Sequence, residues 1–257
     1  MHKIIYNETE LPMQELETIG LAAGGQLLLN EDDLKALLSG RRTGMQQLQN
    51  LEAENIKIKS MDAKVSVRRN ASGKTELVIH PVYRKPPTPD FLDEQEAKQL
   101  ENGELSSVLK ITKDRKGNTK EVLVEYDNET HEFIVSDTEK IQSPDMVNGE
   151  FLTAAQKENY RKGKEVNIPD GTRFNYSATD RNGIRSNKIA LIASILVDGG
   201  LTYIAYRALN AIFGHKRDEK EVEKLSAGYY NALRDMQDQQ TQTGGQSREI
   251  NIRAVKR

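Results

Sequence analysis

The fold of this chain is decided by the stretch Leu29-Asn30-Glu31-Asp32-Asp33-Leu34-Lys35-Ala36-Leu37-Leu38-Ser39-Gly40. Its pattern is a leucine followed eleven positions later by a glycine, and it returns at Leu92–Gly103 and at Leu152–Gly163. Starting points 60 to 63 residues apart are typical of one supersecondary unit that a chain uses several times. The sequence therefore predicts a tandem array.

Each copy is predicted to open with a short helix. The residue after the leucine is Asn30, Asp93 or Thr153, and its side chain can accept a hydrogen bond from an unpaired amide of the first helical turn. The closing glycine supplies the left-handed conformation that ends a helix. Because a helix of about ten residues is marginal alone in water, we expect its apolar face to dock on neighbouring strands.

After each helix, strand-forming residues recur in short runs that are separated by turn residues. The runs are Ile56–Ile58, Val65–Val67 and Leu77–Ile79 in the first copy, Val108–Ile111, Val122–Val124 and Phe133–Val135 in the second, and Val166–Ile168 and Phe174–Tyr176 in the third. The two runs of the third copy lead to Asp180-Arg181-Asn182-Gly183, where the Asn-Gly pair favours a tight hairpin turn. Each unit is therefore predicted to be a short helix plus a β-hairpin, with the third unit truncated.

Composition limits the classes of protein that fit. With 36% hydrophobic residues and no tryptophan, the cores are expected to be small and aliphatic. The chain has no cysteine, which excludes disulfide scaffolds, thiol catalysis and cysteine-based zinc sites. The N-terminal residues lack the apolar run of a secretory signal, so we expect a cytoplasmic protein.

The net charge of −2 hides an uneven distribution along the chain. Residues 41–89 carry ten Lys and Arg against four Asp and Glu, residues 90–150 carry seven against sixteen, and residues 151–217 carry eleven against five. This basic, acidic, basic order is a solvated surface in the simplest interpretation. The alternatives are attraction between neighbouring units and two positive faces for a polyanion.

The apolar segment Ile189–Phe213 is long enough to raise the question of a membrane span. Asp198 lies near its centre and Arg207 adds a second charge, while Gly199-Gly200 weakens a helix where it should be continuous. The interpretation we favour is a helical hairpin that turns at these glycines and packs on the sheets or on a partner. Membrane attachment through residues 189–213 is an alternative.

The C-terminal part is predicted to hold an amphipathic helix that ends near Asp238. Its apolar face would consist of Val222, Leu225, Tyr229, Leu233 and Met236. The Gln-, Thr- and Gly-rich residues that follow have almost no apolar content and should be disordered.

The motifs in the sequence that resemble catalytic or cofactor-binding sites are incomplete. Ser72-Gly73-Lys74-Thr75 looks like the end of a phosphate-binding loop, but Arg68 stands where that loop needs a glycine. The only carboxylates beside a histidine are in Glu129-x-His131-Glu132, a weak metal signal for which we prefer a solvated turn. We therefore predict no enzyme activity, no metal and no cofactor.

The hairpin tips combine cations with turn residues, which can hold phosphate groups. The candidate nucleic-acid contacts are Arg68, Arg69, Lys74, Arg115, Lys116, Arg181 and Arg185. Few aromatic residues accompany these cations, so stacking on single strands is poorly supported.

Several segments together resemble proteins with tandem domains of unknown function carried on conjugative elements of gut Bacteroidota-type bacteria. The segments are Leu27–Arg42, Leu77–Pro81, Phe91–Gly103, Val124–Thr130 and Phe151–Gly163, within about residues 10 to 185. The resemblance implies a mobile-element cargo or accessory role, often beside DNA-processing genes. It supplies no catalytic residues.

The sequence thus predicts an α+β array of three tandem short-helix plus β-hairpin units, followed by a C-terminal helical hairpin and an amphipathic helix. The expected divisions are a first unit with an N-terminal helix (1–89), a second, acidic unit (90–150), a third, truncated unit (151–187), the helical hairpin and amphipathic helix (188–238) and a disordered basic tail (239–257).

The function expected is that of a non-enzymatic binding or adaptor protein of a mobile genetic element that acts through protein contacts. Nucleic-acid binding through the basic turns is an alternative. Partner contacts are expected at edge strands and in the apolar segment. The candidate residues there are Ile195, Leu196, Leu201, Tyr203 and Tyr206.

Overall fold

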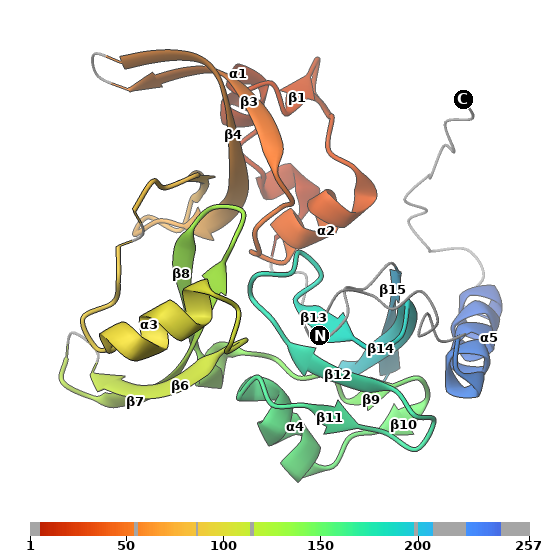
Figure 1. The fold of residues 1–257 in the computed structure, drawn as a ribbon. Coiled ribbons are helices and arrows are strands. Elements are labelled where there is room, and N and C mark those ends of the chain that lie inside the picture. Colours follow the sequence, from red (N-terminus) through yellow and green to blue (C-terminus); the bar gives the residue numbers. More distant parts are fainter. Residues whose placement is uncertain are drawn as a thin grey trace.

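The computed structural model describes residues 6–53, 56–85, 87–113, 116–197, 200–207 and 225–242. Short helices alternate with antiparallel sheets along the chain, which confirms the α+β class (Figure 1). In the view of Figure 1, the first part of the chain lies above the second and third parts.

The first part packs two helices on a three-stranded sheet of order β3-β4-β5. Its elements are a 3-10 turn (Glu8–Glu10), α1 (Met13–Thr18), β1 (Ala22–Ala23), β2 (Gln26–Leu27), α2 (Glu31–Leu38), β3 (Gln46–Ala53), β4 (Ile56–Arg69) and β5 (Thr75–Pro81). Leu16, Leu37, Leu48 and Val65 are fully buried in its core. The core therefore joins both helices to the sheet.

The second part repeats this plan with α3 (Glu94–Glu101) and a sheet of order β6-β7-β8, formed by β6 (Val108–Lys113), β7 (Thr119–Asp127) and β8 (Glu132–Asp137). A 3-10 turn (Thr138–Lys140) follows the sheet. Leu100 of α3 packs on Val122 and Val124 of the central strand. Leu123 points to the opposite face and joins the core of the third part.

The third part contains α4 (Ala154–Arg161) and a sheet formed by β11 (Val166–Asn167), β12 (Arg173–Tyr176) and β13 (Ile184–Ser186). Beside it lies a four-stranded sheet of order β10-β9-β14-β15, which is called the fourth sheet here because the short two-stranded sheet of β1 and β2 is not counted. Its strands are β9 (Met146–Val147), β10 (Glu150–Phe151), β14 (Ala190–Val197) and β15 (Gly200–Arg207). Tyr160, Phe174 and Leu191 are fully buried in the core that these two sheets share.

The helix boundaries agree with the predicted capping chemistry. The side chains of Asn30, Asp93 and Thr153 accept hydrogen bonds from the amides of Asp33, Glu96 and Gln156. The closing glycines have φ angles of 66°, 72° and 68° and are Gly40, Gly103 and Gly163. Each of these three helices is followed by a three-stranded sheet. The three runs predicted for the second copy fall in β6, β7 and β8, whereas β3 of the first copy and β13 of the third copy had no predicted run.

The prediction of a helical hairpin in Ile189–Phe213 was wrong. Residues 190–197 and 200–207 are the antiparallel strands β14 and β15, and residues 208–213 lie outside the described residues. The segment is rich in β-branched and aromatic residues, which favour strands. Within the described residues, no helix has both the length and the apolar character that crossing a bilayer requires.

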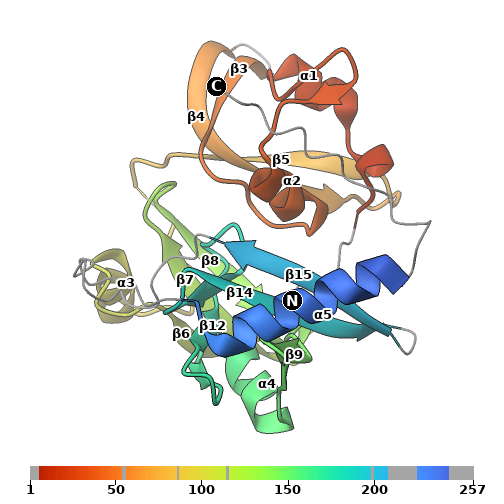
Figure 2. The ribbon, with the colours of Figure 1, turned by 90° about the vertical axis from the view of Figure 1, so that its right-hand side faces the viewer.

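The C-terminal helix α5 (Ala227–Gln242) lies across the fourth sheet (Figure 2). Tyr229 and Ala232 pack on Ala190 and Ile192 of β14, and Leu233 also faces this cluster. The predicted apolar face of the amphipathic helix thus includes residues that cover the sheet. The rest of the predicted basic tail, from residue 243, and Val222 lie outside the described residues.

Candidate partner-binding edge

The hydrogen bonds of β14 determine which backbone groups of the neighbouring strand β15 point towards β14 and which point outward. The carbonyls of Ile192 and Ser194 accept from the amides of Asn148 and Asp145, on the β9 side. The amide of Ile192 donates to the side chain of Asn148, also on that side. Because strand residues alternate in the direction of their backbone groups, the other residues of β14 bond to β15.

The register then shows which residues of β15 point outward. Ala193 lies opposite Ile204, so Ile204 bonds inward to β14, as do the residues two positions away on either side. The backbone groups of Leu201, Tyr203, Ala205 and Arg207 therefore point away from the sheet. β15 is the last strand of its sheet, and within the described ranges no hydrogen bond reaches these outward groups.

Both faces of the β14–β15 hairpin are covered. On one face, Ile195, Ile204 and Tyr206 pack into the core that the third and fourth sheets share, which is called the main core below. Burial there raises the pKa of Tyr206. On the other face, Tyr203 and Ala205 pack beneath α5. Burial also raises the pKa of Tyr203, and the negative charge of Asp235 on α5 acts in the same direction. The edge is therefore a rigid row of peptide groups between two packed layers.

The five predicted partner-binding residues are distributed over this hairpin in different ways. Tyr206 is buried, whereas Ile195 and Tyr203 are partly buried in the two covering layers. Leu196 is 57% exposed on β14. The side chain of Leu201 lies outside the described residues, although its backbone belongs to the outward row. Among the four of these side chains that the structure describes, that of Leu196 alone is exposed.

Three other edge strands in the described ranges carry protecting features. On β5, the amide of Leu77 donates to the side chain of Glu15, and the strand ends at Pro81, which has no amide hydrogen. On β3, the amide of Gln49 donates to the carbonyl of Ile19. β6 carries lysines along its edge. Such devices prevent pairing with other chains, and β15 has no charge or proline before its final residue.

A polar cluster fixes α5 over the sheet. The carboxylate of Asp170 accepts hydrogen bonds from the side chains of Ser226 and Asn148. Burial acts to raise the pKa of Asp170, but these hydrogen bonds, with those from Thr172, lower it. Gly228 of α5 lies so close that a β-carbon there would be 2.7 Å from the Asp170 carboxylate. This contact leaves the helix little freedom to shift at its N-terminal end.

Charged residues join the first two parts of the chain. The ammonium group of Lys64 on β4 lies 3.0 and 2.8 Å from the carboxylate oxygens of Asp127 on β7, and both side chains are 3% exposed. Glu129 lies 2.8 Å from the same ammonium group. Arg42 donates to Glu132 of β8 at 2.6 Å. The basic residues of the first part thus form ion pairs with acidic residues of the second part.

A serine, a histidine and a carboxylate meet at the same junction. Ser66 Oγ lies 2.9 Å from His80 Nε2, and His80 Nδ1 lies 3.5 Å from Glu132 Oε2. This order of groups occurs in hydrolase triads. Here, however, Arg42 donates to the same carboxylate oxygen. The arrangement therefore links two strands of the first part to β8, and we assign it to the junction.

Acid should weaken this junction. Burial acts to raise the pKa of Glu132, but hydrogen bonds from His80 and Arg42 outweigh it and lower the pKa from 4.5 to about 2. A carboxylate with a lowered pKa stabilises the fold above its unfolded pKa and loses this contribution as the pH falls towards the folded value. We expect Glu132→Gln to reduce the loss of stability between pH 4.5 and pH 2, measured by urea unfolding. An unchanged acid dependence would contradict this assignment.

A second junction joins the second and third parts through a buried carboxylate. Glu125 on β7 accepts hydrogen bonds from Ser177 Oγ at 2.7 Å and from the amide of Ala178 at 2.6 Å. Burial raises the pKa of Glu125, although the nearby Arg185 opposes this shift. Since both donors belong to the loop after β12, the contact holds the second sheet against the third part.

The first basic turn, residues 68–74 where β4 leads into β5, contains three of the predicted nucleic-acid contacts. Two of these three cations form ion pairs with carboxylates. Arg68 Nε lies 2.5 Å from the carboxylate of Glu76, and Arg69 lies 2.8 Å from that of Glu10. The side chain of Lys74 is exposed, with no bond to another described residue.

Arg181 and Arg185 make contacts inside the chain. Arg181 lies 3.2 Å from the carboxylate of Asp32 in α2, and its carbonyl accepts a hydrogen bond from Arg41. Arg185 donates to Thr179 within its own part. Lys116 also takes part in an interaction, and Arg115 lies outside the described residues. These contacts place Arg181 at the junction of the first and third parts.

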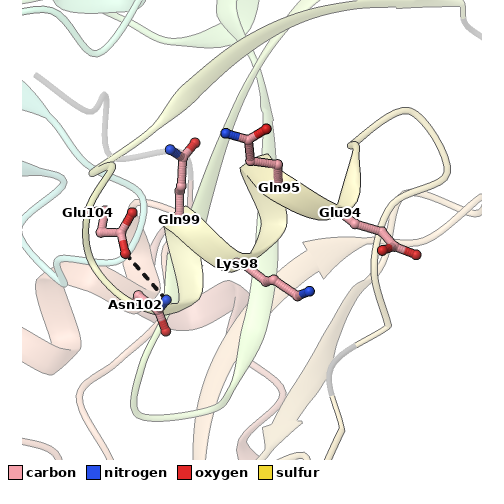
Figure 3. A pocket seen from close by; sticks show the side chains of 6 residues that line it. All are labelled: Glu94, Gln95, Lys98, Gln99, Asn102 and Glu104. Carbon is pink, nitrogen blue, oxygen red and sulfur yellow. Dashed lines mark hydrogen bonds between the residues drawn. The ribbon is translucent and has the colours of Figure 1, made fainter.

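An open hollow lies along α3 (Figure 3). It is lined by Glu94, Gln95, Lys98, Gln99, Asn102 and Glu104. Figure 3 shows these side chains spread along the helix, with a hydrogen bond between Asn102 and Glu104. Among the described residues, no group of three His, Asp or Glu side chains could hold a metal ion. The hollow therefore offers only scattered polar contacts.

The comparisons with known proteins concern mainly the first part of the chain. Residues 6–90 match the model of a family described as "Protein of unknown function (DUF4099)". The match supports a domain of unknown function at this position. No curated protein and no solved structure matches the chain.

Proposed function

We propose that the chain is a non-enzymatic adaptor protein that binds a protein partner by strand addition at the outer edge of β15. The observation that carries this proposal is the row of outward backbone groups at Tyr203, Ala205 and their neighbours, which meet no hydrogen bond within the described residues. An extended segment of a partner can satisfy such groups with its own amides and carbonyls.

The surroundings of the edge support this mode of binding. α5 covers one face of the hairpin and the main core supports the other, so little order has to be gained when a partner strand pairs. Backbone pairing supplies affinity that depends little on the partner's sequence. Exposed side chains near the hairpin, such as Leu196, would add selectivity.

Protein binding has more support than binding of nucleic acid through the basic turns. Arg68, Arg69 and Arg181 are each paired with a carboxylate of the chain, so they would have to exchange these partners for phosphates. The resemblance described above supports a further proposal, that the protein serves a mobile genetic element in the cytoplasm.

A proline at the edge tests the proposal. Proline removes one outward amide hydrogen, and sheets tolerate it on an edge strand where that amide faces solvent. We expect Ala205→Pro to weaken partner capture about tenfold, because one backbone hydrogen bond is lost and its acceptor is left unpaired. The measurement is quantitative mass spectrometry of proteins that co-purify with the tagged chain from its native host.

The matched control is Ala205→Ser, which keeps the amide hydrogen and nearly the same side-chain volume. Proteins retained by the unmodified chain and by Ala205→Ser but lost from Ala205→Pro are the expected partners. If all three forms retain the same proteins in equal amounts, strand addition at β15 is not how this protein binds.

A further inference from the structure

We propose that the partner at the β15 edge is a second copy of this chain, paired antiparallel so that two four-stranded sheets become one continuous sheet. This inference rests on the proposed function, because both use the same edge, and it names the partner. Self-pairing needs an edge that matches itself when it is turned by a two-fold rotation.

The outward residues of β15 meet this condition. With the two-fold axis at Ile204, Tyr203 lies opposite Ala205 of the second copy, and Leu201 lies opposite Arg207 of the second copy. All four outward residues of each strand then pair with outward residues of the other. Registers centred on Tyr203 or on Ala205 leave one outward residue of each copy unpaired, so the axis at Ile204 makes the largest number of backbone contacts.

Side-chain size favours the same register. Tyr203 and Ala205 point to the face that α5 covers. Residues directly opposite each other on paired strands have neighbouring side chains. A large side chain would therefore lie beside a small one at both symmetry-related positions. In the register centred on Tyr203, two tyrosines would face each other beneath the helices.

The opposite edge of the sheet explains why pairing would stop at two copies. That edge is β10, which has only the two residues Glu150 and Phe151. Two residues offer too few backbone groups for a further strand of comparable length. Pairing through β15 therefore gives a closed dimer rather than a fibre.

The absence of cysteine from the chain allows a direct test by cross-linking. At the proposed axis, Ile204 lies opposite Ile204 of the second copy in a non-hydrogen-bonded pair, whose Cα atoms are about 4.5 Å apart. This separation lies within the range of about 4.4 to 6.8 Å that disulfides span. We expect Ile204→Cys to form a disulfide-linked dimer under mild oxidation.

The matched control is Leu196→Cys on the neighbouring strand, which is more exposed but lies away from the axis. Cross-linking by random collision would favour this variant, whereas the proposed pairing favours Ile204→Cys. Light scattering of the purified, unmodified chain should give twice the monomer mass of 29.0 kDa. Ala205→Pro should give the monomer mass with an unchanged far-ultraviolet spectrum.

A monomer mass at every concentration, or equal cross-linking of the two cysteine variants, would overturn self-pairing. The proposed function has a separate test. If the purified chain is monomeric and Ala205→Pro still loses proteins that the unmodified chain captures, strand addition remains and the partner is a different protein. If the purified chain is dimeric through β15 but captures no host protein at this edge, self-pairing stands and the adaptor role fails.

Discussion

Replacing Lys64 by methionine is expected to lower the free energy of unfolding by about 3 kcal/mol, because the change leaves the carboxylate of Asp127 buried without its ammonium partner. Lys64 and Asp127 are each 3% exposed and come from different sheets. Because methionine preserves most of the side-chain volume, the loss of stability is due to removal of the charge and not to a cavity. Urea unfolding at neutral pH measures the effect.

The matched control is Lys57→Met on the same strand. The Lys57 side chain is 82% exposed and pairs with Glu52 at 2.9 Å. An exposed ion pair contributes about 0 to 1 kcal/mol, so the free energy of unfolding of this variant should be close to that of the unmodified chain. The double variant Lys64→Met with Asp127→Leu should recover much of the stability, since it removes both buried charges. Equal effects of Lys64→Met and Lys57→Met would show that the buried pair does not fasten the two sheets.

The local elements of the fold could be predicted from the sequence because their causes are local. Asn30, Asp93 and Thr153 cap their helices through residues three positions ahead, and the closing glycines adopt the expected positive φ angles. β3 was missed because its first residues, Gln46-Gln47-Leu48-Gln49, are mostly polar. Leu48 alone of these four is buried, so the strand depends on a contact that local propensity does not reveal.

The hairpin of β14 and β15 was mistaken for helices for a different physical reason. A strand with one face in water alternates between apolar and polar residues, whereas a strand covered on both faces does not. Ile192 faces α5 and Leu191 faces the main core, so neighbouring residues are both apolar. Length and composition were then the only signals, and the Gly199-Gly200 pair fitted either interpretation.

The candidate site lay largely beyond sequence reasoning. An edge is open only if no other strand or side chain pairs with it, and this depends on strand order across the whole chain. The contacts that use the predicted cations are also remote in sequence, as between Arg181 and Asp32. One signal was available: the strand from Gly200 to Tyr206 has no charge and no proline to protect an edge.

The glycine that closes the third helix is expected to be far less replaceable than the glycine that closes the second. Gly163 has a φ angle of 68°, and a β-carbon there would lie 2.9 and 3.0 Å from the methyl groups of Leu123 and 3.2 Å from Ser107 Oγ. Leu123 is 1% exposed and sits in the shared core, so it has little room to move.

Gly103 occupies the equivalent position, with a φ angle of 72°, and a β-carbon there would meet nothing within 4 Å. Gly103→Ala should therefore cost only the left-handed backbone strain, about 1 to 2 kcal/mol. Gly163→Ala adds overpacking of about 1 to 3 kcal/mol against Leu123 and should cost about 2 to 4 kcal/mol in all. Thermal or urea unfolding of the two variants measures the difference directly. Equal losses would mean that the second sheet does not pack against the end of α4 as closely as these distances require. In that case, the double variant Gly163→Ala with Leu123→Ala should lose as much stability as the two single variants combined.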